Sequence, residues 1–329
     1  MVNRNSIGRA LVRAAVILPF MAVCSCKTFT KKPPVQPAQV IDEQRPWLTS
    51  GARPRVALVL SGGSSRGFAH IGVIRQMEKE KIPIDFIVGT SAGSLIGALY
   101  GKTRNSQELE SVGLELRKED IFDFTLLTPT QGFVKGESFA LYLKNKFGDT
   151  RLEQLRVPLY ITATDLQTGE LVLFSSGPVD TAVLASASIP GLFPPVLIGS
   201  RQYVDGGVVS NLPVETARQK GADIVIAVDL SKESPNRELK DVVDYVMQSV
   251  SIMMSMGSQV QVLGADIAIR PNLDHIGIWD FDHKKELISI GQQSTKDLLP
   301  RFRQVFNQWY ASRTPDKSTA RSKPPRRRI

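Results

Sequence analysis

The sequence predicts a layered α/β fold with a largely parallel central sheet flanked by helices. Residues 55–60 form an unbroken apolar run, which is typical of a strand buried on both faces of a parallel sheet. A glycine-rich turn and a helical pattern over residues 68–80 follow, and residues 84–88 are a second apolar run that leads into another helix. This β-α-β-α order indicates parallel strands joined by crossover helices.

The middle of the chain continues the pattern with one irregular stretch. Ser106 is placed to cap a helix that ends near Glu119, and residues 137–147 predict another helix. Residues 120–136 have no clear period and are rich in phenylalanine and leucine, so we expect a mobile apolar flap there.

The second half of the chain alternates further strands and helices. A methionine-rich helix is expected at residues 237–264; such a helix can form an adaptable lipid surface, but filling gaps in a core is the commoner role and is our expectation. The other helices are expected at residues 179–188, just past Pro213 and at 284–309, and the strands at 159–163, 170–174, 196–198, 202–204, 223–230 and 265–270.

The net charge of +9 is concentrated at the two ends of the chain. The first 25 residues contribute +3 and residues 311–329 contribute +6, so the body between them is neutral. A nucleic-acid-binding protein would carry a basic stripe along its own elements, so the charge pattern argues against that class. The basic tail from residue 311 is rich in Ser, Thr and Pro, and we expect it to be disordered.

The N-terminus predicts an export signal. Basic residues precede the ten-residue apolar segment 14–23, which is about half the length that a membrane span needs. Residues 23–26, Val-Cys-Ser-Cys, resemble the lipobox of bacterial lipoproteins, and Cys26 is the better lipidation site because Ser25 before it is small whereas Val23 before Cys24 is large. The alternative is an ordinary cleaved signal. No cysteine follows Cys26, so no disulfide is expected inside the mature chain.

We therefore divide the chain into a lipoprotein signal (1–25), a proline-rich tether (26–54), an α/β body (55–310) and a basic tail (311–329). Several acyl chains on Cys26 would anchor the chain stably. The expected location is the bacterial cell envelope, at the outer membrane facing the periplasm.

Ser91 is the candidate nucleophile. It is the centre of Gly89-Thr-Ser91-Ala-Gly93, which lies between a strand and a helix, as a nucleophile elbow requires. The free N–H groups at the helix start can stabilise a developing negative charge there. Residues 62–67, Gly-Gly-Ser-Ser-Arg-Gly, follow a buried strand in the same way, and their N–H groups are candidates for binding an oxyanion.

Two bases are possible for Ser91. One arrangement is a triad of Ser91, Asp205 and either His275 or His283, and the other is a Ser91–Asp205 dyad in which the carboxylate takes the proton directly.

Four sequence blocks together resemble the motifs of the patatin-like phospholipase family, in that family's order. They are Gly62–Gly72, Gly89–Gly93, Ala185–Pro195 and Asp205–Gly207, within residues 55–215. The resemblance implies a three-layer patatin-like fold in which Ser91 and Asp205 form a catalytic dyad. It also implies an oxyanion hole formed by Gly62, Gly63, Ser64, Arg66 and Gly67, with Arg66 helping to hold the loop. His70 would then only support or pack against this loop.

Ser64 departs from the family pattern, which usually has a third consecutive glycine there. If the position requires a positive φ, serine costs about 1 kcal/mol or more and could tilt an oxyanion donor.

The resemblance implies a serine lipid acyl hydrolase that acts on phospholipids or lysophospholipids, and the scheme requires no metal or cofactor. Together with the predicted lipidation of Cys26, the expectation is a membrane-anchored enzyme. A broad carboxylesterase, an acyltransferase and a non-catalytic lipid-binding lipoprotein are the alternatives. The expected partners are the lipid substrate and the membrane surface, and no nucleic acid.

Overall fold

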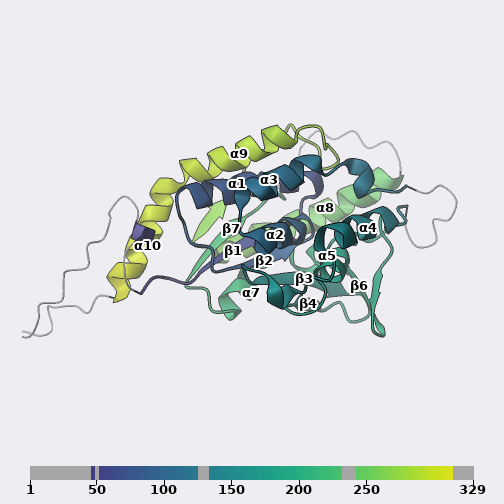
Figure 1. Cartoon of the computed structure of the whole chain (residues 1–329), viewed down its shortest axis with the longest axis horizontal. Coiled ribbons are helices and arrows are strands. Elements are labelled where there is room, and N and C mark those ends of the chain that lie inside the picture. Colours follow the sequence, from purple (N-terminus) through teal and green to yellow (C-terminus); the bar gives the residue numbers. More distant parts are fainter. Residues whose placement is uncertain (1–45, 49–51, 125–132, 232–241, 314–329) are drawn as a thin grey trace, which may run out of the picture. The chain divides into compact units, whose positions relative to one another are not determined.

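The computed structural model describes residues 46–48, 52–124, 133–231 and 242–313 (Figure 1). The predicted signal, Cys26, most of the tether, the centre of the flap, the first residues of the methionine-rich helix and the basic tail lie outside the described residues. All described residues belong to one compact unit, Gln39–Ile329.

The described residues form helices and strands in the expected alternation. The strands are β1 Val56–Leu60, β2 Phe86–Thr90, β3 Leu159–Asp165, β4 Leu171–Phe174, β5 Val196–Ile198, β6 Arg201–Asp205, β7 Ile224–Val228 and β8 Ile267–Ile269. The α-helices are α1 Phe68–Lys79, α2 Ala92–Thr103, α3 Ser106–Glu115, α4 Glu137–Phe147, α5 Val179–Ser186, α6 Gly207–Ser210, α7 Val214–Gln219, α8 Val242–Gln261, α9 Lys284–Asp297 and α10 Leu299–Arg313. Short 3₁₀ turns lie at Pro46–Leu48, Ser64–Gly67, Lys118–Asp120, Leu152–Gln154 and Val262–Gly264.

One largely parallel sheet is the centre of the fold. Its main order is β5-β6-β3-β2-β1-β7-β8, and β4 also pairs with β3. Strands β3, β2, β1, β7 and β8 run parallel, whereas β4 and β6 are antiparallel to β3, and β5 is antiparallel to β6. The prediction of a largely parallel α/β sheet flanked by helices is confirmed.

Helices cover both faces of this sheet. Along β1, Val56, Leu58 and Leu60 belong to the larger core, which includes residues of α1, α2 and α9. Ala57 and Val59 belong to a second core on the other face, which includes residues of α7 and the Val262–Gly264 turn. Every residue of β1 is therefore fully buried, as its unbroken apolar sequence predicted.

The structure corrects three details of the sequence interpretation. Asn105, and not Ser106, caps α3, because its Oδ1 accepts the N–H groups of Gln107 and Glu108. The predicted terminal helix is two helices that part at Leu298. Pro300 is the second residue of α10, and its missing N–H suits the first turn of a helix. Trp47, in the segment assigned to the tether, is 3% exposed, so the folded body includes it.

We expected the methionines of the helix now seen as α8 to fill gaps in the core, and for two of them this expectation is wrong. Met253 and Met256 are 61% and 65% exposed. The periodicity of the helix was evident from the sequence, but the choice of its buried face depended on the tertiary packing.

Candidate active site

Ser91 lies in the sharp turn between β2 and α2. Its backbone has φ 52° and ψ −120°, a conformation that serine rarely adopts, so the elbow is strained as active-site turns often are. Side chains would not fit at the flanking glycines: a Cβ at Gly89 would lie 2.7 Å from the carbonyl oxygen of Gly93, and one at Gly93 would lie 2.2 Å from that of Leu60. These close approaches are the physical reason for the Gly-x-Ser-x-Gly pattern.

The sheet register brings Asp205 close to this elbow. In β3, Thr162 pairs with Thr90, which precedes Ser91, and the next residue, Ala163, pairs with Asp205. The buried hydroxyls of Thr90 and Thr162 lie 2.7 Å apart and link the two strands. Ser91 and Asp205 line the same cavity, although they are 114 positions apart in the sequence.

The Asp205 carboxyl is fully buried and one of its oxygens is unpaired. Oδ1 accepts the Gly207 N–H at 2.7 Å, whereas Oδ2 has no hydrogen-bond partner among the described residues. Burial raises the pKa of Asp205 to about 6, against smaller lowering effects of the Ser91 hydroxyl and the Gly207 N–H. Asp205 is therefore a carboxylate at neutral pH with an oxygen available to take a proton.

Ser186 joins the two candidate catalytic residues. Its Oγ accepts the Ser91 N–H at 2.8 Å, and its carbonyl oxygen accepts the Gly206 N–H at 3.3 Å. The Asp205 N–H is bound in turn by the Ser188 carbonyl oxygen at 2.9 Å. The third sequence block thus fixes the distance between the elbow and the Asp205 turn.

The glycine-rich loop presents two unengaged amides. The Gly62 N–H donates to Asn211 Oδ1 at 3.1 Å, and the Ser65 N–H donates to the Ile278 carbonyl oxygen. The Gly63 and Ser64 N–H groups have no acceptor among the described residues. Ser64 has φ 51°, so the position does require the left-handed conformation that favours glycine.

Arg66 holds this loop against the segment between β8 and α9. Arg66 is 3% exposed, and its guanidinium donates from Nε to the Ile276 carbonyl oxygen at 3.0 Å and from Nη2 to that of Leu273. The Ser65 hydroxyl donates to the Gly277 carbonyl oxygen at 3.1 Å. Gly67 then packs on the start of α2, where an added Cβ would lie 2.8 Å from the Cβ of Ala92.

The three histidines lie apart from the Ser91–Asp205 pair. His70 is fully buried, its Nε2 contacts the Ser61 carbonyl oxygen at 2.8 Å, and burial lowers its pKa to about 4. His275 and His283 are exposed and pair with Glu286 and Asp280. Neither of these two histidines lines a cavity that contains Ser91, so the structure does not bring Ser91, Asp205 and a histidine together as a triad.

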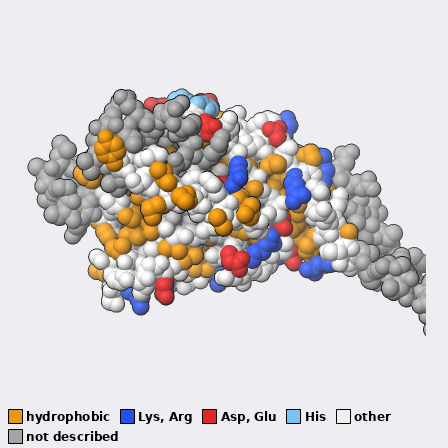
Figure 2. Space-filling view, turned by 180° about the vertical axis from the view of Figure 1, so that it is seen from behind, with side chains coloured by type: hydrophobic (Ala, Val, Ile, Leu, Met, Phe, Trp, Pro, Cys, Tyr) orange, Lys and Arg blue, Asp and Glu red, His pale blue; other side chains and the backbone are white. Residues whose placement is uncertain are grey.

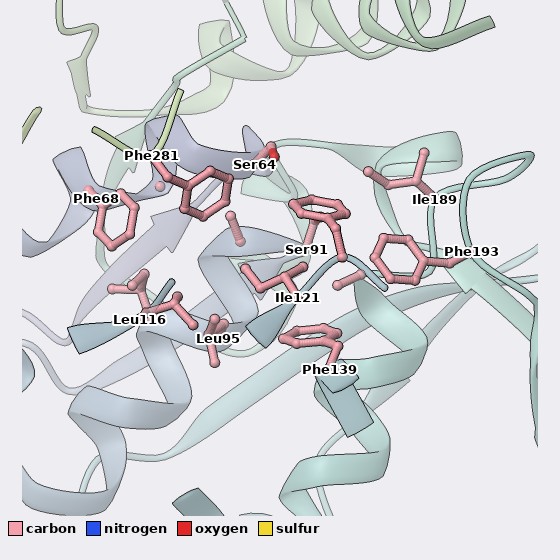
Figure 3. A pocket seen from close by; sticks show the side chains of 15 residues that line it. Ser64, Phe68, Ser91, Leu95, Leu116, Ile121, Phe139, Ile189, Phe193 and Phe281 are labelled. Atoms are coloured by element: carbon pink, nitrogen blue, oxygen red, sulfur yellow. The ribbon is translucent and has the colours of Figure 1, made fainter. Parts of the chain in front are cut away.

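Two cavities meet at Ser91. The first, of about 60 Å³, is a narrow apolar crevice (Figure 3). Ser91 and Ser64 lie on its wall, with aromatic and aliphatic side chains around them: Phe68, Leu95, Leu116, Ile121, Phe122, Phe139, Ile189, Phe193 and Phe281.

The second cavity is wider, at about 260 Å³, and more polar. It is lined by Asp205, Asn211, Ser231 and Ser251 as well as by the glycine-rich loop. The arrangement suits an ester whose acyl chain and polar part lie on opposite sides of Ser91.

Residues 58–218 match a protein-family model described as patatin-like phospholipase. This match contains the elbow, the loop at 62–67 and Asp205. The chain contains a patatin-like phospholipase domain. Together with the helix-flanked, largely parallel sheet, this confirms the resemblance inferred from the four sequence blocks.

The curated relatives to which this chain is similar are much longer proteins. The chain is 31% identical over 281 residues to "Lysophospholipase NTE1" of Coccidioides immitis, covering 75% of this chain and 18% of that one. It is 33% identical over 186 residues to "Patatin-like phospholipase domain-containing protein 6" of Mus musculus, covering 54% and 14%. The chain thus spans less than a fifth of the length of these relatives.

Among solved structures, VipD from Legionella pneumophila is similar to 77% of this chain and to 68% of its own, with 14% identity and a TM-score of 0.47.

Sequence reasoning missed the residues that hold the site together. Asn211, Ser186 and Thr162 are uncharged and carry no motif of their own, although Ser186 lies inside the third block and Asn211 follows Asp205 closely. Their role depends on contacts between distant segments. Among the described residues there is also no group of three or more His, Cys, Asp or Glu side chains that could hold a metal ion.

Proposed function

We propose that the protein is a membrane-anchored lipid acyl hydrolase in which Ser91 and Asp205 act as a dyad. The observation that carries the proposal is the shared cavity of Ser91 and a buried Asp205 whose Oδ2 is unpaired and whose pKa is raised to about 6. A carboxylate of that pKa is a better base than an exposed aspartate.

In the first step, the Ser91 oxygen attacks the ester carbonyl carbon while its proton passes to Asp205 Oδ2. The carbonyl oxygen becomes an oxyanion, for which the Gly63 and Ser64 N–H groups are the donors, aided by the N-terminus of α2. The Gly62 N–H is engaged by Asn211, so we assign it to holding the loop. The alcohol leaves with the proton from Asp205, and the acyl group stays on Ser91.

In the second step, water attacks the acyl-enzyme. Asp205 Oδ2 takes a proton from this water, the same amides hold the new oxyanion, and the proton returns to Ser91 as the fatty acid leaves. Every proton is accounted for by Asp205, so the scheme uses no histidine.

We propose phospholipids or lysophospholipids as the substrates. The apolar crevice suits an acyl chain and the wider cavity suits the glycerol and headgroup. The two curated relatives named above, a lysophospholipase and a patatin-like phospholipase domain-containing protein, support this class.

The first experiment is hydrolysis of phosphatidylcholine and lysophosphatidylcholine by residues 27–329, with EDTA present. We expect fatty acid release by the wild type and a loss of at least about 10³-fold in Ser91→Ala and in Asp205→Asn. His283→Ala is the matched control and retains activity. Wild-type activity in either dyad variant contradicts the dyad. Release from short esters but not from lipids would favour a carboxylesterase, and no release from any ester would favour a lipid-binding protein.

We also propose that lipidation at Cys26 anchors the chain in the cell envelope. The support is the sequence alone, because these residues lie outside the described part of the chain. Cells expressing wild type or Cys26→Ala are fractionated, with Cys24→Ala as the control. Equal recovery of wild type and Cys26→Ala in the membrane fraction contradicts the anchor.

A further inference from the structure

Helix α8 has one face toward the catalytic cavity. Ser251 and Met254 line the cavity that contains Ser91 and Asp205. One turn further on, the buried Ser258 hydroxyl accepts a hydrogen bond from Asn211 Nδ2 at 3.1 Å. Asn211 Oδ1 accepts the Gly62 N–H, so a short chain of hydrogen bonds connects α8 to the oxyanion loop.

The opposite face of α8 and the turn after it expose large apolar side chains. Ile252, Met253, Met256, Val260 and Leu263 are 43%, 61%, 65%, 71% and 82% exposed, and we call these five the α8 stripe. Met253, Met256, Val260 and Leu263 follow one another at a spacing of three to four residues, which keeps them on one side of the helix, and Ile252 lies beside Met253. Figure 2 shows hydrophobic side chains gathered on the side of the molecule where α8 lies, with few charged side chains among them.

The α8 stripe is free of charge. From Tyr245 to Ala265 the sequence contains no Asp, Glu, Lys or Arg. Within the part of the chain that the structure describes, no helix is long and apolar enough to cross a membrane. An exposed apolar helix face can lie in the plane of a membrane surface, and in α8 the opposite face is held against the protein by Met254 and Ser258.

We propose that the α8 stripe docks on the surface of a lipid bilayer and turns the catalytic cavity toward it. The inference rests on the proposed function, because it gives a membrane lipid a route to Ser91. A lipid bilayer is favoured as the partner of the stripe because the same helix carries both the stripe and one wall of the catalytic cavity. A lipid would then reach Ser91 along α8 with little exposure to water.

A further observation favours lipid as the occupant of the stripe. Tyr245 lies on the same face of α8, nearer the start of the helix, and is 54% exposed, and tyrosine is enriched where proteins meet the membrane–water interface. Residues 27–45, which are part of the predicted tether (26–54), would reach up to about 60 Å at full extension, so a chain anchored at Cys26 can lay α8 on the bilayer that holds its anchor.

The test measures vesicle binding without catalysis. Residues 27–329 carrying Ser91→Ala are floated with phosphatidylcholine vesicles, which carry no net charge and therefore do not attract the basic tail. We expect binding that is unchanged between 0.1 and 0.5 M salt, because the stripe is uncharged. A second chain carrying Met256→Glu and Leu263→Glu is expected to bind at least tenfold more weakly.

Leu141→Glu is the matched control, because Leu141 on α4 is 62% exposed, close to the value of Met256. It is expected to bind as the parent does, and circular dichroism checks that each variant is folded. The proposal is overturned if the parent does not bind, if the stripe variant binds equally well, or if the control loses as much. It is also overturned if light scattering shows a dimer that the stripe substitutions dissociate.

The two proposals fail in different ways. If vesicle binding depends on the stripe but the wild-type chain releases no fatty acid, the docking surface is supported and the hydrolase is contradicted. If fatty acid release depends on Ser91 but the stripe substitutions do not change vesicle binding, the hydrolase is supported and the docking surface is contradicted.

Discussion

At the scale of single residues, the site depends on a buried carboxylate that opposes folding. The free energy of unfolding falls as the pH rises from about 4 to about 6, because the unfolded chain ionises Asp205 more easily than the folded chain does. Stability lost in this way is typical of groups retained for chemistry rather than for the fold.

The difference in unfolding free energy between Asp205→Asn and wild type is expected to move in favour of the variant as pH rises. Wild type loses stability from Asp205 between pH 4 and 6, whereas asparagine does not titrate and keeps an Oδ1 for the Gly207 N–H. The gain in unfolding free energy should be about 2 kcal/mol larger at pH 8 than at pH 4. Urea unfolding of both proteins at the two pH values measures it. An equal difference at both pH values would contradict the raised pKa.

The same pKa predicts the pH dependence of activity. Below about pH 6 the Asp205 carboxyl is protonated and cannot accept the Ser91 proton, so kcat/KM should fall about tenfold per pH unit. His70 has its pKa lowered to about 4 and does not titrate in this range. Initial rates with a soluble short-chain ester between pH 4.5 and 9 provide the measurement. A rate that is constant down to pH 4.5 would exclude Asp205 as the base.

Ser64→Gly is expected to stabilise the fold without a large change in rate. Serine at φ 51° is strained, and relief of that strain outweighs the extra freedom of glycine in the unfolded chain by about 0.5–1 kcal/mol. Because Ser64 already adopts the positive φ, its N–H points as that of glycine would, and kcat should change by less than about threefold. Thermal unfolding and turnover are compared with Ser64→Ala, which keeps the strain. A tenfold gain in kcat would instead show that serine impairs the oxyanion hole.

At the scale of elements, close helix contacts explain glycines that carry no chemistry. Where α1 meets α9, a Cβ at Gly72 would lie 1.9 Å from the Ile288 carbonyl oxygen, and one at Gly291 would lie 2.0 Å from that of Ala69. The two backbones touch at these points. Gly72 belongs to the first sequence block, so part of that motif serves helix packing rather than catalysis.

Gly291→Ala and Gly257→Ala should therefore have opposite effects. The added methyl group at Gly291 meets backbone atoms that cannot move aside, and the expected loss of unfolding free energy is about 3 kcal/mol. Gly257 lies within α8 with no atom within 4 Å of an added Cβ, so alanine should stabilise the helix by up to about 1 kcal/mol. Denaturant unfolding of the two variants tests the pair. Equal effects would show that α1 and α9 can separate at low cost.

At the scale of the whole molecule, the patatin-like match is too short to fold as the structure does. The matched residues 58–218 end before β7, which pairs with β1 along its whole length. Trp47, upstream of the match, donates to the Glu80 carbonyl oxygen and packs on Phe302 and Phe306 of α10. Segments on both sides of the match therefore complete the core.

A chain that ends at Ser231 is expected to lose cooperative unfolding and activity. It lacks the buried Phe302 and Phe306 and the carbonyl groups that hold Arg66. A chain that ends at Arg313 is the control and should unfold cooperatively. Near-ultraviolet circular dichroism during heating distinguishes them. A sharp transition in the shorter chain would show that the later helices are dispensable.

The sequence by itself determined the layered α/β class and the strand-elbow-helix around Ser91. These features follow from local periodicity and from glycines that a tight turn requires, so they are readable in short windows. The pairing of Ser91 with Asp205 was an expectation that the resemblance to the patatin-like family implied. Only the tertiary structure decided which N–H groups of the glycine-rich loop remain unengaged, that Ser186 and Asn211 hold the site, and that Met253 and Met256 face outward. Those properties depend on which distant segments meet, and contacts across long stretches of chain leave no local pattern.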